Sequence, residues 1–236
     1  DKDWINNWKQ YFKPFTVDHI LIKPTWEEIP EEHKDKLLIQ IDPGTAFGTG
    51  KHETTQLCIR QLEKYVKPGV KVLDLGTGSG AIAVTLAKEL PNACMTATDI
   101  SDRALAVAKE NARRLGATIS FSLGNWFESL PGHHQYNIIV SNPPYIRPDD
   151  THLKTLRFEP RGALTDEVDG LTCIRTLIAG AIPYLASGGV LLLEHGYDQA
   201  CPVRALFNQD GRYEPAETVK DLAGNDRVTY ARKRLC

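Results

Sequence analysis

Short apolar runs alternate with longer amphipathic stretches from residue 70 to the C-terminus. The apolar runs are too short for most helices and predict buried strands, at residues 70–75, 94–99, 118–123, 136–141 and 190–196. The amphipathic stretches predict helices, at residues 81–90, 101–115, 171–189 and 198–207. Residues 213–221 and 227–233 predict a closing pair of strands. This alternation predicts a mostly parallel sheet with helices on both faces.

The helix predicted at residues 101–115 carries its own start and stop signals. Ser101 can cap its first turn, and Gly116 can end it in a left-handed conformation. Apolar side chains recur on one face at helical spacing, at Leu105, Ala108, Ala112 and Leu115. This segment therefore predicts a helix with one face packed on the sheet.

The pattern is less regular toward the N-terminus. Residues 19–26 and 35–44 predict short strands, and residues 54–66 predict a helix. We expect residues 1–50 to form a strand-rich N-terminal extension. Residues 51–236 are expected to form the main domain, and the two parts together one compact unit.

Composition narrows the class of protein. Of 236 residues, 42% are apolar and 25% are charged, and the net charge is −2. A near-neutral chain lacks the broad basic surface that duplex nucleic acid requires, although a local basic stripe can exist within it. Five cysteines stand singly, without a C-x-x-C pair or zinc-ligand spacing. We expect reduced thiols, no metal centre and a cytoplasmic location, and the absence of a long apolar run predicts no membrane span.

Three glycines separate the strand at residues 70–75 from its helix, in the sequence VLDLGTGSGAIAV. Glycine permits a tight turn and a close approach of a ligand to the backbone. Asp99 ends the next strand, 23 residues after Gly76, where a carboxylate can accept hydrogen bonds from ribose hydroxyls. Because such sheets bind ligands at the carboxyl ends of their strands, this combination predicts a site for a nucleoside cofactor.

Asn142-Pro143-Pro144-Tyr145 follows the strand at residues 136–141 and must end it, because prolines cannot donate to a sheet. An amide or exocyclic amine is a poor nucleophile because its lone pair is delocalised. The Asn142 side-chain oxygen and the Pro143 carbonyl can accept hydrogen bonds from its two N–H groups and orient the nitrogen for attack. Tyr145 can cover the planar group. The alternative, a stiff turn without chemistry, does not account for the Asn and the Tyr.

Together these motifs resemble those of the S-adenosylmethionine-dependent methyltransferases. The turn reads G-x-G-x-G after Asp74, unlike the G-x-G-x-x-G of dinucleotide enzymes. The resemblance implies a Rossmann-like, seven-stranded sheet whose last strand is antiparallel. It also implies that Asp74 and the turn lie beside the methionine part of the cofactor and that Asp99 binds its ribose. The residues assigned to the turn are Gly76, Thr77, Gly78 and Gly80.

From the glycine turn to the C-terminus the chain resembles the glutamine N5-methyltransferases of peptide-chain release factors. The matching stretches are GNWFESL, VSNPPYIRPDD, RFEPRGAL, DGL, LLLEHGYDQ and DRVTYAR. This resemblance implies that Trp126 packs near the adenine and that Asn142, Pro143 and Tyr145 hold the substrate glutamine. Asn142 is expected to contact the cofactor as well. Asn125 stands where that family has an aspartate.

The first third resembles a different family, the methyltransferases that trimethylate a ribosomal stalk protein. The stretches are DKDWINNWKQYFKPFTVDHILIKPTWEE and IDPGTAFGTGKHETTQLCIRQLEKYV. The resemblance implies that Phe47, Gly48 and Thr55 contact the cofactor. A P-loop is excluded because Thr45 and His52 occupy the positions of its first glycine and its Ser/Thr. A plain glycine-rich turn before a helix remains the alternative.

We therefore expect a hybrid of two catalytic domains, joined near the shared VLDLGTGSG and without the substrate-recruiting domain of either family. The expected activity is S-adenosyl-L-methionine-dependent methylation of a release-factor glutamine, with S-adenosyl-L-homocysteine as product. The ribosomal stalk protein is a less favoured substrate. Two alternatives remain open: methylation of a nucleic-acid base amine, and a hybrid that binds the cofactor but has little or no turnover.

Overall fold

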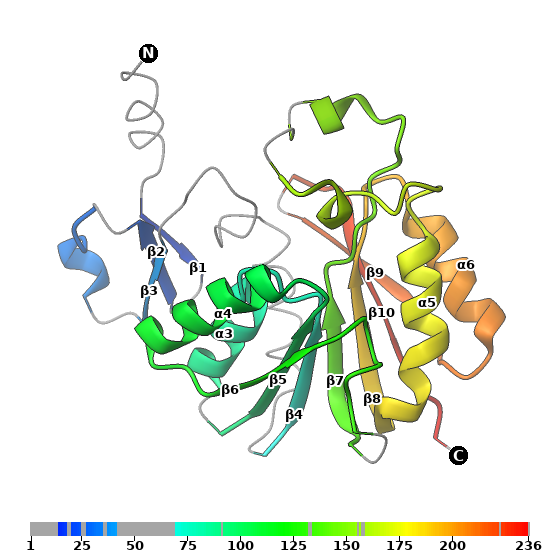
Figure 1. The fold of residues 1–236 in the computed structure, drawn as a ribbon, viewed down its shortest axis with the longest axis horizontal. Helices are drawn as coiled ribbons and strands as arrows, with labels where there is room; N and C mark the ends of the chain where they lie inside the picture. The colour runs from blue at the N-terminus through cyan, green and yellow to red at the C-terminus, as the bar shows by residue number, and fades with distance from the viewer. Residues whose placement is uncertain are drawn as a thin grey trace.

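The computed structural model describes residues 14–17, 20–24, 27–34, 37–41, 69–90, 92–131, 134–154, 156, 159–221 and 223–235 (Figure 1). Its largest feature is a seven-stranded sheet. In spatial order the strands are β6 (Ile119–Leu123), β5 (Cys94–Asp99), β4 (Lys71–Leu75), β7 (Tyr136–Ser141), β8 (Leu185–Glu194), β10 (Asp226–Arg232) and β9 (Glu217–Lys220). The strands β6 to β8 run parallel, and β10 is antiparallel to both neighbours. The predicted sheet, mostly parallel with an antiparallel last strand, is confirmed.

The order of the strands reverses beside β4. The chain leaves β4 for β5 and β6 on one side and then returns to β7 on the other. Connections that depart in opposite directions leave a crevice beyond the carboxyl ends of the two central strands, where sheets of this kind bind their ligands. The glycine turn follows β4 and the Asn-Pro-Pro-Tyr tetrad follows β7, so both motifs border that crevice.

In the described part of the chain, four helices cover the two faces of the sheet: α3 (Ala81–Glu89), α4 (Asp102–Leu115), α5 (Thr172–Ala181) and α6 (Ala200–Asp210). Alternate strand residues enter different cores, because side chains alternate between the faces of a sheet. Ile139 joins a cluster with α5 and α6, whereas Ile138 joins a cluster with α3. In Figure 1, α3 and α4 lie together on one side of the strands and α5 and α6 on the other.

The predicted boundaries of α4 are confirmed. Ser101 Oγ accepts a hydrogen bond from the Ala104 N–H at 3.2 Å, and Gly116 ends the helix with a φ of 63°. The helix predicted at residues 171–189 is shorter than expected. It ends at Ala181, a 3₁₀ turn follows at η5 (Ile182–Tyr184), and β8 begins at Leu185. Pro183 explains the early end, because it lacks an N–H and restricts the residue before it.

A second, three-stranded sheet lies in the N-terminal part of the chain. It contains β1 (Phe15–Val17), β2 (Ile20–Pro24) and β3 (Leu37–Ile41), with a 3₁₀ turn, η2 (Glu31–His33), before β3. Two of these strands were predicted, and β1 was missed because only three residues form it. The helix predicted at residues 54–66 lies outside the described residues. Within the described part of the chain, no helix is long and apolar enough to span a membrane.

Candidate functional site

A cleft of about 140 Å³ lies beyond the carboxyl ends of β4 and β7. It is lined by residues of the glycine turn, of the tetrad and of a later loop, namely Gly76, Thr77, Gly78, Ser79, Ala81, Ile82, Asn142, Pro143, Tyr145, Ile146, Glu159, Ala163 and Leu164. The two motifs, more than sixty residues apart in the chain, therefore share one cavity. A ligand that fills it contacts both.

Close packing explains two of the glycines in the turn. At Gly80 the backbone has a φ of 83°, and an added Cβ would lie 3.1 Å from the Cβ of Ala108 on α4. At Gly76 the φ is 70°, and the Trp126 ring would lie 3.4 Å from an added Cβ. Any other residue type would strain the backbone at both positions, and at Gly80 it would also crowd Ala108. Glycine here lets the turn pack against α4 on one side and Trp126 on the other.

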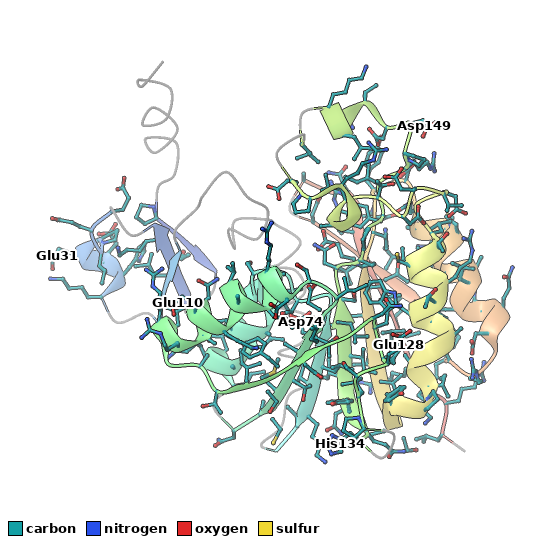
Figure 2. The ribbon with its side chains drawn as sticks, in the orientation of Figure 1. Glu31, Asp74, Glu110, Glu128, His134 and Asp149 are labelled. Atoms are coloured by element: carbon teal, nitrogen blue, oxygen red, sulfur yellow. The ribbon has the colours of Figure 1, made fainter. Side chains whose placement is uncertain are left out.

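Asp74 is the buried acid of the site, with 1% of its surface exposed (Figure 2). Its Oδ2 accepts hydrogen bonds from the Thr77 hydroxyl at 2.7 Å and from the Ala83 N–H at 3.2 Å. Its Oδ1 has no hydrogen-bond partner among the described residues. Burial raises the pKa of this carboxyl from 3.8 to about 7, although both hydrogen bonds oppose the shift. The protonation of Asp74 is therefore expected to change when a charged or hydrogen-bonding ligand binds beside it.

Asp99 ties the glycine turn to the end of β5. One carboxylate oxygen accepts from the Gly78 N–H and the other from the Ser101 N–H, each at 2.8 Å. A carboxylate has about four acceptor positions, so capacity remains for ligand hydroxyls. The sequence motif suggested ribose binding, and the structure adds that the same side chain shapes the turn.

Apolar side chains are exposed beside Asp99 at the same edge of the sheet. Ile100 is 72% exposed, and Leu123, paired in register with Asp99, is 54% exposed. The sequence analysis missed both, although an apolar residue directly after a strand-ending acid is a usable signal. A carboxylate next to exposed apolar groups suits a nucleoside, which joins a polar ribose to a base with apolar faces.

Trp126 and Asn125 follow β6. Trp126 is half-buried, its ring faces Gly76 and its φ is 47°, a conformation uncommon outside glycine. The Asn125 side chain is exposed and lies 3.4 Å from a carboxylate oxygen of Glu128. The ring therefore borders the glycine turn, whereas Asn125 faces solvent.

The tetrad leaves β7 between two anchored strands. The Ser141 hydroxyl donates to the Leu75 carbonyl at 2.7 Å and so joins the ends of β7 and β4. Pro143 is buried and Asn142 is half-buried, facing the cleft. The Tyr145 hydroxyl donates to Glu194 Oε1 at 3.1 Å, and Glu194 is fully buried at the end of β8. Glu194 was not predicted as a site residue, because 49 residues separate it from Tyr145.

The structure thus gathers most of the residues singled out from the sequence at one edge of the sheet. They are Asp74, Gly76, Thr77, Gly78, Gly80, Asp99, Trp126, Asn142, Pro143 and Tyr145. The predicted cofactor contacts Phe47, Gly48 and Thr55 lie outside the described residues. Among the described residues, no group of His, Cys, Asp and Glu side chains can hold a metal ion.

Comparison with known proteins finds similarity to two differently named groups of proteins. The family profile of ribosomal protein L11 methyltransferase (PrmA) matches residues 1–143. The release factor glutamine methyltransferase of Neisseria gonorrhoeae is 51% identical over 183 residues, which is 76% of this chain and 66% of the relative. The two matches overlap, because together they exceed the length of the chain. Further relatives with the latter name are covered over 59% to 68% of their length.

One further relative and one solved structure are also similar to this chain. The ribosomal protein L11 methyltransferase of Lachnoclostridium phytofermentans is 54% identical over 112 residues, 47% of this chain and 33% of the relative. The crystal structure of ribosomal protein L11 methylase from Lactobacillus delbrueckii subsp. bulgaricus superposes with a TM-score of 0.70 at 24% identity, covering 94% of this chain and all of that one. At that identity the superposition supports the fold alone. The chain spans about two thirds or less of the length of most of these relatives.

Proposed function

Because the chain belongs to the class I S-adenosylmethionine-dependent methyltransferases, and over residues 1–143 to the ribosomal protein L11 methyltransferase (PrmA) family, we propose that it methylates a protein side chain. The proposed acceptor is the side-chain amide of a glutamine in a peptide-chain release factor. One amide N–H is replaced by N–CH₃, and the other products are S-adenosyl-L-homocysteine and a proton. Relatives named release factor glutamine methyltransferase, about 50% identical in sequence, support this choice of substrate.

The observation that carries the proposal is the single cleft shared by the glycine turn and the tetrad. Asp74, the turn, Asp99 and Trp126 would hold the cofactor on one side. Asn142 and Pro143 would accept the two amide N–H groups of the glutamine on the other. When bound, the cofactor supplies an electrophilic methyl group. The protein contributes mainly by orienting the nitrogen, which is worth several orders of magnitude when the reactants are well aligned.

The fit of the cofactor rests on three features of the site. Asp74 presents a buried oxygen without a partner among the described residues, the glycine turn leaves room against the backbone, and Ile100 offers an exposed apolar surface beside Asp99. These features suit, respectively, a polar group, a closely approaching chain and a base. Phe47 and Gly48, in the N-terminal extension of residues 1–50, and Thr55, just after it, remain proposed further contacts.

The chain is further proposed to be a hybrid of two methyltransferases. Its first 143 residues match one family, and most of its length matches relatives of another. The family match ends at Pro143, inside the tetrad. A hybrid joined within the shared region would retain one cofactor site and one amide clamp, formed by Asn142 and the Pro143 carbonyl, because both belong to the same sheet.

The test is mass spectrometry of a release factor incubated with the protein and S-adenosyl-L-methionine. We expect one added methyl group on a glutamine. Asn142→Ala is expected to lower kcat by roughly 100-fold or more, since a misplaced nitrogen of the substrate amide loses the advantage of orientation. The affinity for the cofactor should stay nearly constant. Asn208→Ala, exposed on α6, is the matched control and should retain full activity. Equal rates in both variants would refute the clamp.

A second substrate follows from the match to the L11 methyltransferase family over residues 1–143. The same assay with ribosomal protein L11 in place of the release factor tests it. A methyl group on a lysine or on the terminal amine of that protein, with none on glutamine, would favour this substrate instead. Cofactor binding without transfer to either protein would favour a hybrid without turnover.

A further inference from the structure

The backbone of the tetrad must be held in place by groups other than its own N–H donors. Two of its four residues are prolines and have no N–H, so the segment cannot be fixed by sheet hydrogen bonds as β7 is. A clamp built from Asn142 and the Pro143 carbonyl works only if the backbone that carries them is held still. At its start the segment is fixed by Ser141, which bonds to the end of β4.

At its other end the tetrad is held by the side chain of Gln199. The Gln199 Nε2 donates to the Tyr145 carbonyl at 3.0 Å and to the Gly170 carbonyl at 3.3 Å. The Gln199 Oε1 accepts from the Gly196 N–H at 2.8 Å. One amide therefore joins the tetrad, the loop before α5 and the turn after β8, and only 2% of the residue is exposed.

The position of Gln199 in its own helix shows that this role is not a by-product of capping. Gln199 is the N-cap residue of α6, a position where Ser, Thr, Asp and Asn are preferred because their side chains accept from the first turn. The Gln199 side chain makes no such bond within the described helix. Its two donated hydrogen bonds instead reach the tetrad and the loop before α5, and its oxygen accepts from Gly196 in the turn that leads into the helix.

The segments around the Gln199 amide are closely packed. Gly170 has a φ of 75°, and an added Cβ would lie 2.3 Å from the Tyr145 carbonyl oxygen and 2.8 Å from the Gln199 Nε2. The turn that supplies the Gly196 N–H is fixed in turn by His195. Its Nδ1 bonds to the Gly196 carbonyl and its Nε2 to the Thr229 hydroxyl, each at 2.8 Å.

We propose that Gln199 is a positioning residue for methyl transfer, which holds the tetrad carbonyls and Asn142 in the orientation that receives the substrate amide. This inference rests on the proposed function. Gln199 does not line the cleft, so it acts through the tetrad and makes no contact with substrate. Its loss is expected to affect the rate of transfer more than the affinity for the cofactor.

The experiment compares Gln199→Met with Gln209→Met. Both replace a glutamine of the α6 region by a side chain of similar length, but Gln209 is exposed at the far end of the helix. For Gln199→Met we expect kcat for the release factor to fall roughly 10- to 100-fold, as for a small misplacement of reacting groups, with cofactor Kd within about twofold of the wild type. Gln209→Met should match the wild type in both quantities.

Hydrogen exchange gives a readout that does not depend on turnover. The Ile146 N–H, which bonds to the Leu164 carbonyl at 2.9 Å, reports on the segment directly after the tetrad. We expect it to exchange roughly tenfold faster in Gln199→Met, because the segment loses a buried hydrogen bond that anchors it. Amides of β4 and β5 should be unchanged, which separates local loosening from general loss of stability.

Gln199→Glu tests the donor half of the amide and replaces the methionine variant if that one does not fold. A carboxylate keeps the acceptor for the Gly196 N–H but faces two carbonyls without a proton to donate. We expect it to be as slow as Gln199→Met at neutral pH. Wild-type kcat and wild-type exchange at Ile146 in either variant would overturn the inference. If the wild type methylates no glutamine, the proposed function fails, and the exchange result still decides whether Gln199 holds the tetrad.

Discussion

Replacing Asp74 by Asn should change how the stability of the protein depends on pH. The substitution keeps the shape of the side chain and leaves an oxygen in place to accept from Thr77 and Ala83, as Asp74 Oδ2 does. It removes the ability to ionise and places an NH₂ group where Asp74 has Oδ1, and only the first of these changes depends on pH. The two variants therefore differ mainly in the free energy of placing a negative charge in a fully buried position.

The magnitude follows from the difference between the two pKa values of Asp74. Burial raises the pKa in the folded protein from 3.8 to about 7. Between these values the folded protein keeps a proton that the unfolded chain has released, so the unfolding free energy falls as pH rises. The loss begins near the unfolded pKa and is complete above the folded pKa. At about 1.4 kcal/mol per pH unit, a gap of this size costs the wild type about 4 kcal/mol.

The assay is urea unfolding of the wild type and of Asp74→Asn at several pH values. All other titrating groups contribute equally to both proteins and cancel in the difference. From about pH 5 to about pH 8 we expect the difference in unfolding free energy to move by about 3 kcal/mol in favour of the Asn variant. As a control, Thr77→Val removes a hydrogen bond that lowers this pKa, and should move the midpoint of the change to higher pH. A difference that stays constant with pH would refute the reasoning.

Two further predictions concern Asp99 and His195. Asp99→Ala removes both bonds that tie Gly78 and Ser101, so cofactor affinity measured by calorimetry should fall roughly 10- to 100-fold; unchanged affinity would mean that the ribose site lies elsewhere. His195 is buried, and burial lowers its pKa, although its bond to the Gly196 carbonyl opposes the shift. Its contribution to stability should be present above the ordinary value of 6.5 and be lost as pH falls below it. The stability advantage of the wild type over His195→Gln should therefore shrink in acid, and an advantage independent of pH would contradict the assignment.

Most of the sheet could be predicted because its strands carry local signals. Short apolar runs such as residues 136–141 allow few alternatives when Gly or Pro bounds them, and the cap at Ser101 depends on a contact three residues away. The end of α5 was misjudged because the apolar pattern continues past Pro183 into β8. Apolar periodicity alone does not separate a buried helix from the buried strand that follows it.

The cofactor side of the site was readable from sequence, whereas the supports of the tetrad were not. Asp74, the glycines and Asp99 stand at strand ends in a recognisable spacing. Glu194 and Gln199 lie 49 and 54 residues from Tyr145 and acquire their roles only when β8 pairs with β7. Both lie in LLLEHGYDQ, one of the stretches that carry the family resemblance, but that stretch assigns them no role, since a Glu and a Gln near a strand end are usually solvated.

The location of these supports bears on the hybrid origin proposed for the chain. The match to the L11 methyltransferase family ends at Pro143, and the groups that hold the far end of the tetrad all come later, at Leu164, Gly170, Glu194 and Gln199. The glycine turn and Asp99, by contrast, lie within that match. A junction anywhere before β7 therefore leaves the tetrad and the supports of its far end together on one side. Such an exchange would preserve the geometry of the amide clamp, because no hydrogen bond that fixes its far end crosses the junction.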